Sequence, residues 1–335
     1  MEKKDEFLKS YSFDKEDIAT GLFALDAILG GGFAPGSITT MVAESGIGKS
    51  TIALETASLL AEQGYTVLYI DSEGSISQKL LLSTGAFYQI DKKLFYIRKS
   101  TFSEVEEVID FYLKNTDIQF IFIDSITCLI HDGFVNLNKS KSKSDKAGIS
   151  ITTNNSNYNS RRFGLFMNKY NSIIKQRDLN MILINQYRNK VDMQVGTILT
   201  MASGKAVRYI SDVILSVAPL KGTGKYKDFK DIKKSSNGTE LEFEIIKSNR
   251  LAPHKRVPFY LKYGYGIVNL YSYIYYFLKM DFLKECNNYF TFKTTDGEFK
   301  FHGADELNKN LHNYVKDETA VGVLNYYINE VSDAH

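Results

Sequence analysis

The sequence is poor in the residue types that build disulfide frameworks and metal centres. Its 335 residues include only two cysteines, Cys128 and Cys286, which are too few for a disulfide framework and lack the spacing of metal ligands. Cys128 follows an apolar run, where a free thiol usually packs as a small apolar side chain. The five histidines are scattered and form no recognisable metal-binding or catalytic arrangement. These absences argue against a disulfide-stabilised scaffold and against a His/Cys metal centre.

The chain also lacks a strong net charge and a long hydrophobic run. Its formal charge is +2, so any nucleic-acid site must be local rather than a property of the whole surface. No apolar run reaches the length of a membrane span and no signal peptide is recognisable, which predicts a soluble, cytoplasmic protein without a membrane partner. An apolar fraction of 44% over 335 residues suffices for one large domain plus a small one, or for two ordinary domains.

A phosphate-binding loop is the clearest motif that the chain does contain. Residues 37–42 have the apolar, β-branched character of a buried strand, residues 52–60 have helical spacing, and a glycine-rich turn lies between them. Such a turn directs backbone N–H groups at phosphate, while Lys49 would reach the β- and γ-phosphates and Ser50 would bind Mg²⁺. Ala43 replaces the glycine that usually opens the motif. We expect a nucleoside triphosphate to be bound by Glu44, Ser45, Gly46, Ile47, Gly48, Lys49, Ser50 and Thr51.

Polar residues follow three further predicted strands, at the sheet edge where the phosphate loop would lie. Glu73 follows the strand 66–71 and is placed to deprotonate an attacking water, although a solvated loop glutamate would look the same. Asp124 ends the apolar run 118–124 and is placed to hold Mg²⁺. Gln186 follows the strand 180–185, so that its amide could bind the γ-phosphate and relay its loss to the loop 187–205.

Positive charge is concentrated in one part of the chain. Residues 139–190 contain eleven Lys/Arg and two Asp, a local charge of +9 against +2 for the whole. Residues 136–159 have little apolar content and are predicted to form a mobile loop. A flexible basic segment suits a polyphosphate strand, with an affinity that falls as salt rises. A solvated surface loop is the alternative.

The remaining segments complete a predicted α/β fold with a mostly parallel central sheet. Residues 1–19 form a polar N-terminal segment that is either frayed or docked on a partner. The sequence after residue 268 becomes rich in aromatic residues, with helical and short β patterns, which predicts a small α+β C-terminal domain over 269–335. Further helices are predicted within 20–36, 103–114 and 163–177, strands at 212–217 and 240–247, an edge strand at 259–263, and a lysine-rich hairpin tip at 221–234.

Several motifs occur in the order typical of one protein family. They are residues 20–26, the phosphate loop, 70–73, 123–125, 183–186, 203–208, 247–253 and 263–267. Over essentially its whole length the chain resembles the RecA-family recombinases, and its Asp-Ser-Glu-Gly at 71–74 is similar to that of the T-even phage recombinases. The resemblance implies a RecA-type ATPase core over 20–268, with 1–19 as an oligomerisation segment, in a bacterial cytoplasm or a phage-infected host.

The resemblance also implies roles for individual residues of the ATPase site. ATP and Mg²⁺ would be the cofactors, with Ser50 and Asp124 at the metal. Glu73 would activate water, Lys49 would contact phosphate, and Gln186 would sense the γ-phosphate. Lys247 and Arg250 would reach the ATP of the neighbouring subunit as cations that stabilise the transition state.

A DNA-binding role follows from the same resemblance. The protein would form a helical filament, or a ring, on single-stranded DNA, pair it with homologous duplex and exchange strands, with single-strand-binding and loader proteins as further partners. The first DNA loop would lie within 131–162 and the second would be 187–205. The residues that would contact DNA are Arg161, Arg162, Lys169, Arg188, Lys190, Gly204, Lys205 and Arg208.

The sequence departs from the family pattern at several positions. Leu80 replaces a tyrosine that stacks on adenine, Asn249 replaces a second interface lysine, and Glu242 and Glu244 stand where bacterial RecA has basic residues of the duplex-holding site. The segment 221–234 would then supply the missing positive charge.

Three functions fit these features. The leading hypothesis is a DNA-dependent ATPase that acts as a strand-exchange recombinase. A hexameric helicase-like motor would use the same core but unwind duplex without homologous pairing. A nucleotide-gated DNA-binding scaffold would bind DNA and recruit proteins with little hydrolysis.

Overall fold

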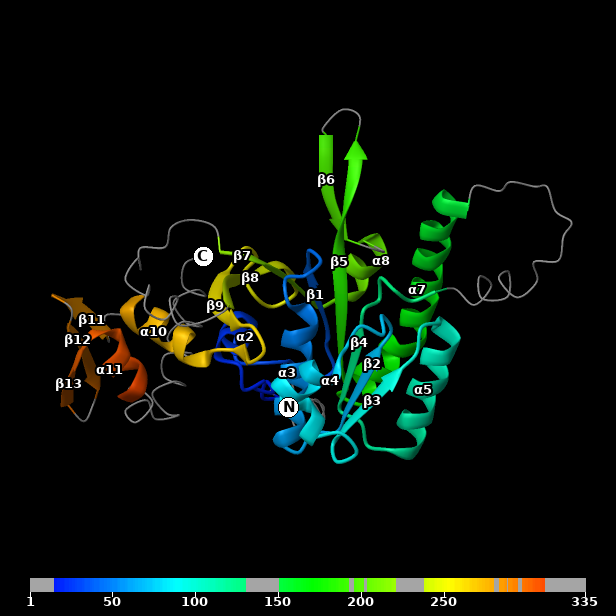
Figure 1. Cartoon of the computed structure of the whole chain (residues 1–335). Helices are drawn as coiled ribbons and strands as arrows, with labels where there is room; N and C mark the ends of the chain where they lie inside the picture. Colours follow the sequence, from blue (N-terminus) through cyan, green and yellow to red (C-terminus); the bar gives the residue numbers. More distant parts are fainter. Residues whose placement is uncertain are drawn as a thin grey trace, which may run out of the picture.

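A computed structural model describes residues 15–130, 151–192, 196–201, 204–220, 238–279, 283–287, 289–294 and 297–310. A large twisted sheet forms the centre of the molecule, and helices cover both of its faces (Figure 1). The strand order is β10-β9-β8-β7-β1-β5-β4-β2-β3, with β6 paired to β5 outside this path. The strands are β1 (Ile38–Ala43), β2 (Val67–Asp71), β3 (Leu94–Arg98), β4 (Phe120–Asp124), β5 (Asn180–Asp192), β6 (Gly196–Met201), β7 (Val213–Pro219), β8 (Gly238–Ser248), β9 (Arg256–Lys262) and β10 (Gly266–Ile267).

The sheet is parallel from β7 to β3 and antiparallel from β7 to β10. Its central strands β1, β2 and β4 are buried along their whole length, which explains their near-continuous apolar sequences. The predicted α/β fold with a mostly parallel central sheet is therefore confirmed.

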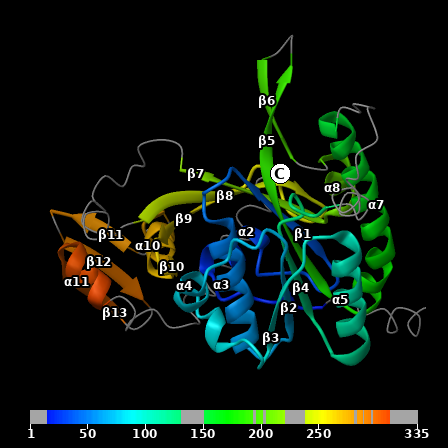
Figure 2. The ribbon, with the colours of Figure 1, turned by 45° about the vertical axis from the view of Figure 1, so that its right-hand side comes forward.

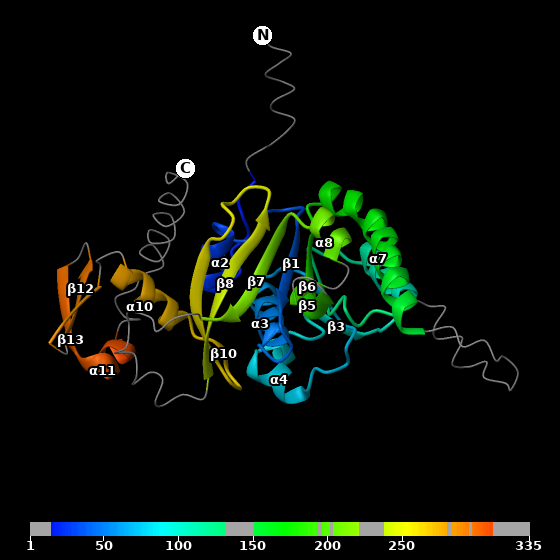
Figure 3. The same cartoon turned by 90° about the horizontal axis from the view of Figure 1, so that it is seen from above.

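Two sets of helices bury the two faces of the sheet, as the view from above shows (Figure 3). One face is covered by α2 (Phe23–Leu29), α3 (Lys49–Glu62) and the short α4 (Gln78–Ser83) with the 3-10 turn η1 (Ala86–Tyr88). The other is covered by α5 (Phe102–Asn115), α7 (Ile151–Gln176) and α8 (Gly204–Ile210). Among the described residues, no helix is long and apolar enough to cross a membrane.

The strand β5 continues past the sheet and pairs with β6 as an antiparallel hairpin that stands away from the core (Figures 1 and 2). Within the segment predicted as a loop at 187–205, residues 187–192 and 196–201 are therefore paired strands, because the register from Tyr187↔Met201 to Asp192↔Gly196 satisfies their backbone groups. The prediction of a mobile loop over 136–159 is wrong for 151–159, which form the first turns of α7. Residues 131–150 and 221–237 lie outside the described residues.

The strand predicted at 259–263 is not at the edge of the sheet. β9 begins at Arg256 and lies between β8 and the two-residue strand β10, which is the true edge. Pro258 is tolerated inside β9, opposite Glu242 of β8.

The described part of the C-terminal segment combines helices and a second, three-stranded sheet. It consists of α10 (Asn269–Lys279), β11 (Leu283–Cys286), β12 (Tyr289–Thr294), β13 (Gly297–His302) and α11 (Gly303–Asn310). Phe277 of α10 packs against Phe292 of β12, with ring centroids 5.0 Å apart, and α10 also contacts α2 and β9. The apolar core thus runs from the large sheet through α10 into the small one.

A carboxylate joins the helix α3 to the edge of the large sheet. Oε2 of Glu55 accepts a hydrogen bond from the backbone N–H of Ile267 in β10 at 2.8 Å. Burial raises the pKa of Glu55 from 4.5 to about 7, and the hydrogen bond from Ile267 opposes this shift. The Glu55 carboxyl group therefore binds a proton more tightly in the native state than in the unfolded chain.

This shift predicts a pH-dependent contribution of Glu55 to stability. The contribution is fully present below the unfolded pKa of 4.5 and is lost as the pH rises through about 7. Glu55→Gln keeps an acceptor oxygen for Ile267 but cannot ionise, so at pH 8 it should unfold with a free energy about 1–3 kcal/mol higher than the wild type. Urea unfolding at several pH values measures this difference. An advantage of the variant that did not grow between pH 5 and 8 would contradict it.

Candidate functional site

The phosphate loop leaves the carboxyl end of β1 and enters α3, as the sequence predicts. Gly46 and Gly48 have φ values of 79° and 104°, which a side chain would disfavour. A Cβ at Gly48 would also lie 2.4 Å from Cδ2 of Leu261 in β9, so a side chain there would displace this leucine. The first turn of α3 has neither a side-chain cap nor an acidic residue. Its N–H groups are therefore suited to an anion.

Lys49 is buried beneath this loop, with 6% of its surface exposed. Its Nζ donates hydrogen bonds to the backbone oxygens of Glu44, at 2.6 Å, and Ala43, at 3.3 Å. Burial lowers the pKa of Lys49, while the nearby carboxylates of Asp124 and Glu73 raise it. These three predicted residues are therefore close enough to interact electrostatically.

Asp124 is buried at the carboxyl end of β4 and has two hydroxyl neighbours. Tyr69 donates its hydroxyl to Oδ2 of Asp124 at 2.8 Å, and the Ser50 side chain also forms a hydrogen bond with this carboxylate. Burial raises the pKa of Asp124, whereas the hydrogen bonds from Ser50 and Tyr69 lower it. The structure thus brings together Ser50 and Asp124, the two residues predicted at the metal.

Glu73 is exposed on the turn that follows β2. The preceding Ser72 is tied to β4, because its N–H donates to the carbonyl oxygen of Asp124 at 2.7 Å and its hydroxyl donates to the carbonyl oxygen of Ser125 at 2.6 Å. Ser72 is buried and Glu73 is exposed, so the Glu73 carboxylate can act on a small molecule at the sheet edge.

Gln186 lies beside the start of the phosphate loop. In the parallel pairing of β1 with β5 it stands opposite Ala43, and its backbone N–H donates to the side chain of the buried Asn185 at 2.8 Å. Thr127, on the segment that follows β4, donates its hydroxyl to the same Asn185 oxygen at 3.2 Å. The sequence does not identify Asn185 as a site residue, because its hydrogen bonds with Gln186 and Thr127 are seen only in the folded structure.

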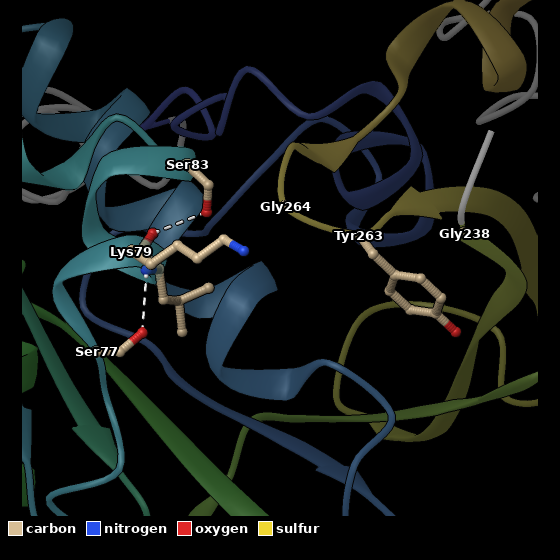
Figure 4. Close-up of a pocket in the computed structure, with 7 residues that line it drawn as sticks. Ser77, Lys79, Ser83, Gly238, Tyr263 and Gly264 are labelled. Carbon is tan, nitrogen blue, oxygen red and sulfur yellow. Dashed lines mark hydrogen bonds between the residues drawn. The ribbon is translucent and has the colours of Figure 1, made fainter.

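An open pocket of about 850 Å³ lies between α4 and the turn that joins β9 to β10 (Figure 4). Its lining includes Lys79 and Leu80 on one side and Tyr263 and Gly264 on the other. Leu80, which replaces a tyrosine of the family pattern, therefore lines this pocket with an aliphatic side chain, and Tyr263 is the aromatic residue opposite.

Lys247 and Arg250 lie away from this edge. Ser248 pairs with Val213, which in turn pairs with Thr39 near the amino end of β1, whereas the phosphate loop begins at the carboxyl end. Lys247 donates to the carbonyl oxygens of Arg208 and Ser211, at 2.8 and 2.6 Å, and so caps the end of α8.

Arg250 is anchored to the N-terminal segment. Its Nη1 lies 2.8 and 2.7 Å from the two carboxylate oxygens of Asp17, and its Nη2 donates to the carbonyl oxygens of Leu29 and Gly32. Neither Lys247 nor Arg250 contacts the phosphate loop of its own protomer in these hydrogen bonds.

The predicted DNA-binding residues differ in how they are partnered. Arg162 pairs with Glu106 of α5 at 2.7 Å, and Lys169 pairs with Asp110 at 2.6 Å. Arg161, by contrast, is exposed and has no ion pair within the described part of the chain. Exposed residues of α8 include Lys205 and Arg208, and Gly204 begins that helix.

The other predicted DNA-binding residues stand on the hairpin. Arg188 pairs with Thr200 and Lys190 with Ile198, so both belong to the projecting part of β5. The hairpin rises near α8 in both Figure 1 and Figure 2.

The residues at the edge of the sheet fit a nucleotide with its metal ion. The buried lysine, the glycines with positive φ and the uncapped α3 suit phosphate, and the Ser50–Asp124 pair offers the oxygen ligands that Mg²⁺ prefers. No cluster of three or more His, Cys, Asp or Glu suited to a metal occurs in the described ranges.

Comparison with known proteins gives one consistent result. The family model described as RecA N-terminal domain matches residues 7–268. The chain is 27% identical over 257 residues to Protein RecA of Francisella tularensis subsp. novicida (strain U112), and equally to that of Francisella tularensis subsp. tularensis (strain SCHU S4 / Schu 4). Each alignment covers 76% of this chain and 65% of the relative, so the chain spans about 65% of the length of the curated relatives it matches.

The contacts of Arg250 predict that it stabilises its own protomer. Removing the guanidinium with Arg250→Ala should lower the free energy of unfolding by about 1 kcal/mol, because a partly exposed charge-assisted pair is lost. A double-mutant cycle with Asp17→Asn should give a coupling of about 0.5–1 kcal/mol. Arg161→Ala is the control, since its side chain is exposed, and should change stability by less than about 0.5 kcal/mol. A coupling near zero would contradict a stabilising Arg250–Asp17 pair.

Proposed function

Since this chain belongs to the RecA family, we propose that it is a DNA-dependent ATPase that assembles on single-stranded DNA and exchanges strands with homologous duplex. The observation that carries the proposal is the convergence of Lys49, Ser50, Asp124 and Glu73 at the edge of the sheet from which the β5–β6 hairpin also rises. In the same proposal residues 20–268 form the ATPase core, 269–335 a C-terminal domain and 1–19 an oligomerisation segment.

ATP binds at the phosphate loop in this mechanism. Lys49 exchanges its hydrogen bonds with the carbonyl oxygens of Ala43 and Glu44 for contacts with the phosphates. Ser50 and Asp124 would hold Mg²⁺, which would supply positive charge against the developing phosphate charge. Glu73 orients a water molecule and accepts its proton, a role that its exposure at the end of β2 permits.

Gln186 links the phosphate to the DNA-binding hairpin. It stands opposite Ala43 and immediately precedes the part of β5 that leaves the sheet. A γ-phosphate bound to the Gln186 amide would therefore act at the base of the hairpin, which carries Arg188 and Lys190, and its loss would release DNA.

The bound nucleotide is shared between two protomers. Lys247 and Arg250 lie near the amino end of β1, whereas the phosphate loop lies at its carboxyl end. They can therefore approach only the γ-phosphate of a neighbouring protomer. This geometry supports a homo-oligomer with ATP between subunits, in which both cations leave their present partners within the protomer.

DNA contacts are formed by the exposed members of the basic set. Arg161 is exposed on α7, and Lys205 and Arg208 are exposed on α8, which contacts α7 and lies near the hairpin. Arg162 and Lys169 are partly neutralised by Glu106 and Asp110, so their contribution to phosphate binding is smaller.

Two substitutions separate ATP binding from hydrolysis. Lys49→Ala removes the phosphate cation and should weaken ATP binding and abolish DNA-stimulated hydrolysis. Glu73→Gln keeps the fold and the binding site but removes the base, so it should bind ATP and DNA while hydrolysis falls at least about 100-fold. Nucleotide binding and hydrolysis with and without single-stranded DNA measure both effects. Full DNA-stimulated hydrolysis by the Lys49→Ala variant would rule out the mechanism.

Strand exchange itself requires a homology-dependent assay. Joint molecules should form between single-stranded DNA and a homologous duplex in the presence of ATP, and should be absent with a heterologous duplex. The Lys49→Ala variant is the matched control and should form none. Unwinding without homologous pairing would indicate a helicase-like motor, and DNA binding with little hydrolysis would indicate a nucleotide-gated scaffold.

A further inference from the structure

A buried carboxylate lies directly behind the turn that carries Glu73. Asp71 ends β2 with 2% of its surface exposed. Its Oδ1 accepts a hydrogen bond from the backbone N–H of Gly74 at 2.7 Å, and its Oδ2 accepts one from the hydroxyl of Tyr96 at 2.7 Å. The side chain of Asp71 therefore holds the residue that follows Glu73.

The neighbouring strand β3 completes this network. Arg98 donates through Nε to the hydroxyl oxygen of Tyr96 at 2.9 Å, and the same atom lies 3.5 Å from Oδ2 of Asp71. Its Nη2 donates to the carbonyl oxygen of Ile76 at 2.5 Å. The Arg98 guanidinium thus contacts both Tyr96 and Asp71, which lie behind the turn, and Ile76 at the far end of the turn.

The turn is consequently fixed from both sides. β2 lies between β3 and β4, with Asp71 opposite Arg98 on one side and opposite Asp124 on the other. Ser72 is bound to the β4 side, while Gly74 and Ile76 are bound through Asp71 and Arg98. Glu73, Gly74 and Ser75 are exposed between the buried Ser72 and Ile76, and Glu73 carries the one carboxylate among them.

We propose that Asp71, Tyr96 and Arg98 are positioning residues that fix the backbone of the 72–76 turn and thereby aim Glu73 at the attacking water. This inference rests on the proposed function, because it assigns the hydrolytic role to Glu73. None of the three contacts the phosphate loop in the hydrogen bonds described. Their effect on the reaction passes through the turn.

The physical basis is the narrow distance range of proton transfer. A general base must lie within hydrogen-bond reach of the proton that it accepts, and an exposed carboxylate on an unrestrained turn would sample many other positions. A displacement of about 1 Å can cost up to about 100-fold in rate. Loss of the network should therefore lower kcat, while the phosphate loop and hence KM for ATP are left intact.

The central variant is Tyr96→Phe, which deletes one hydroxyl and keeps the ring. We expect kcat for DNA-stimulated ATP hydrolysis to fall on the order of 10-fold, with KM within about 2-fold of the wild type. Arg98→Gln should have a similar effect and Arg98→Lys should restore most of the activity, since a lysine can still donate to Tyr96 or Ile76. The matched control is Tyr88→Phe, which removes the hydroxyl of an exposed tyrosine in η1.

A double substitution distinguishes positioning from general loss of stability. If Tyr96 acts through Glu73, Tyr96→Phe should cause no further loss in a Glu73→Gln background. A further 10-fold loss there, or a kcat for Tyr96→Phe equal to that of Tyr88→Phe, would overturn the inference. An inactive wild type would instead refute the proposed function.

A measurement that needs no hydrolysis tests the same network. Hydrogen–deuterium exchange of the peptide that contains residues 72–76 should accelerate at least about 5-fold in Tyr96→Phe and Asp71→Ala, because Asp71→Ala removes the acceptor of the Gly74 amide and Tyr96→Phe removes a hydrogen bond that holds this acceptor in place. The peptide that contains β4 should be unaffected in Tyr96→Phe. Unchanged exchange at 72–76 would overturn the inference whatever the activity of the protein.

Discussion

The parallel pairing of β1 with β5 is the constraint on which the arrangement of the whole site depends. It places Ala43 opposite Gln186, so that the phosphate loop and the hairpin leave the sheet side by side. A shift of one residue in this register would turn Gln186 to the other face of β5 and bury a different set of side chains. Because the two functional segments start from adjacent residues, communication between them needs no long chain of contacts.

The fold and the phosphate site were predictable because their signals are local. A buried strand, a glycine-rich turn and a helix follow one another within residues 37–60, and apolar runs that end in Asp124 and Gln186 identify the other strands at the same edge. The hairpin was missed because residues 187–192 are mostly polar, and 187–192 and 196–201 gain their strand structure by pairing with each other. The first turns of α7 were likewise masked by their polar composition.

The partners of charged residues were the least predictable part of the site. Lys247 and Arg250 were recognised from their motif, but their hydrogen bonds to the end of α8 and to Asp17 join segments that are distant in sequence. The network of Asp71, Tyr96 and Arg98 was missed for the same reason. It depends on the alignment of β2 with β3, which the sequence does not encode as a local pattern.

The capping of α8 by Lys247 has a consequence for the energetics of subunit association. In the single protomer this ammonium group already has two carbonyl acceptors, and the Arg250 guanidinium has a carboxylate. In the proposed oligomer, a neighbour's nucleotide that attracted these groups would compete with their present acceptors, so assembly would exchange one set of acceptors for another instead of neutralising bare charge. In the proposed oligomer Lys247 would leave the carboxyl end of α8, the helix that follows the β5–β6 hairpin in the chain, so the joining of two subunits would loosen that helix.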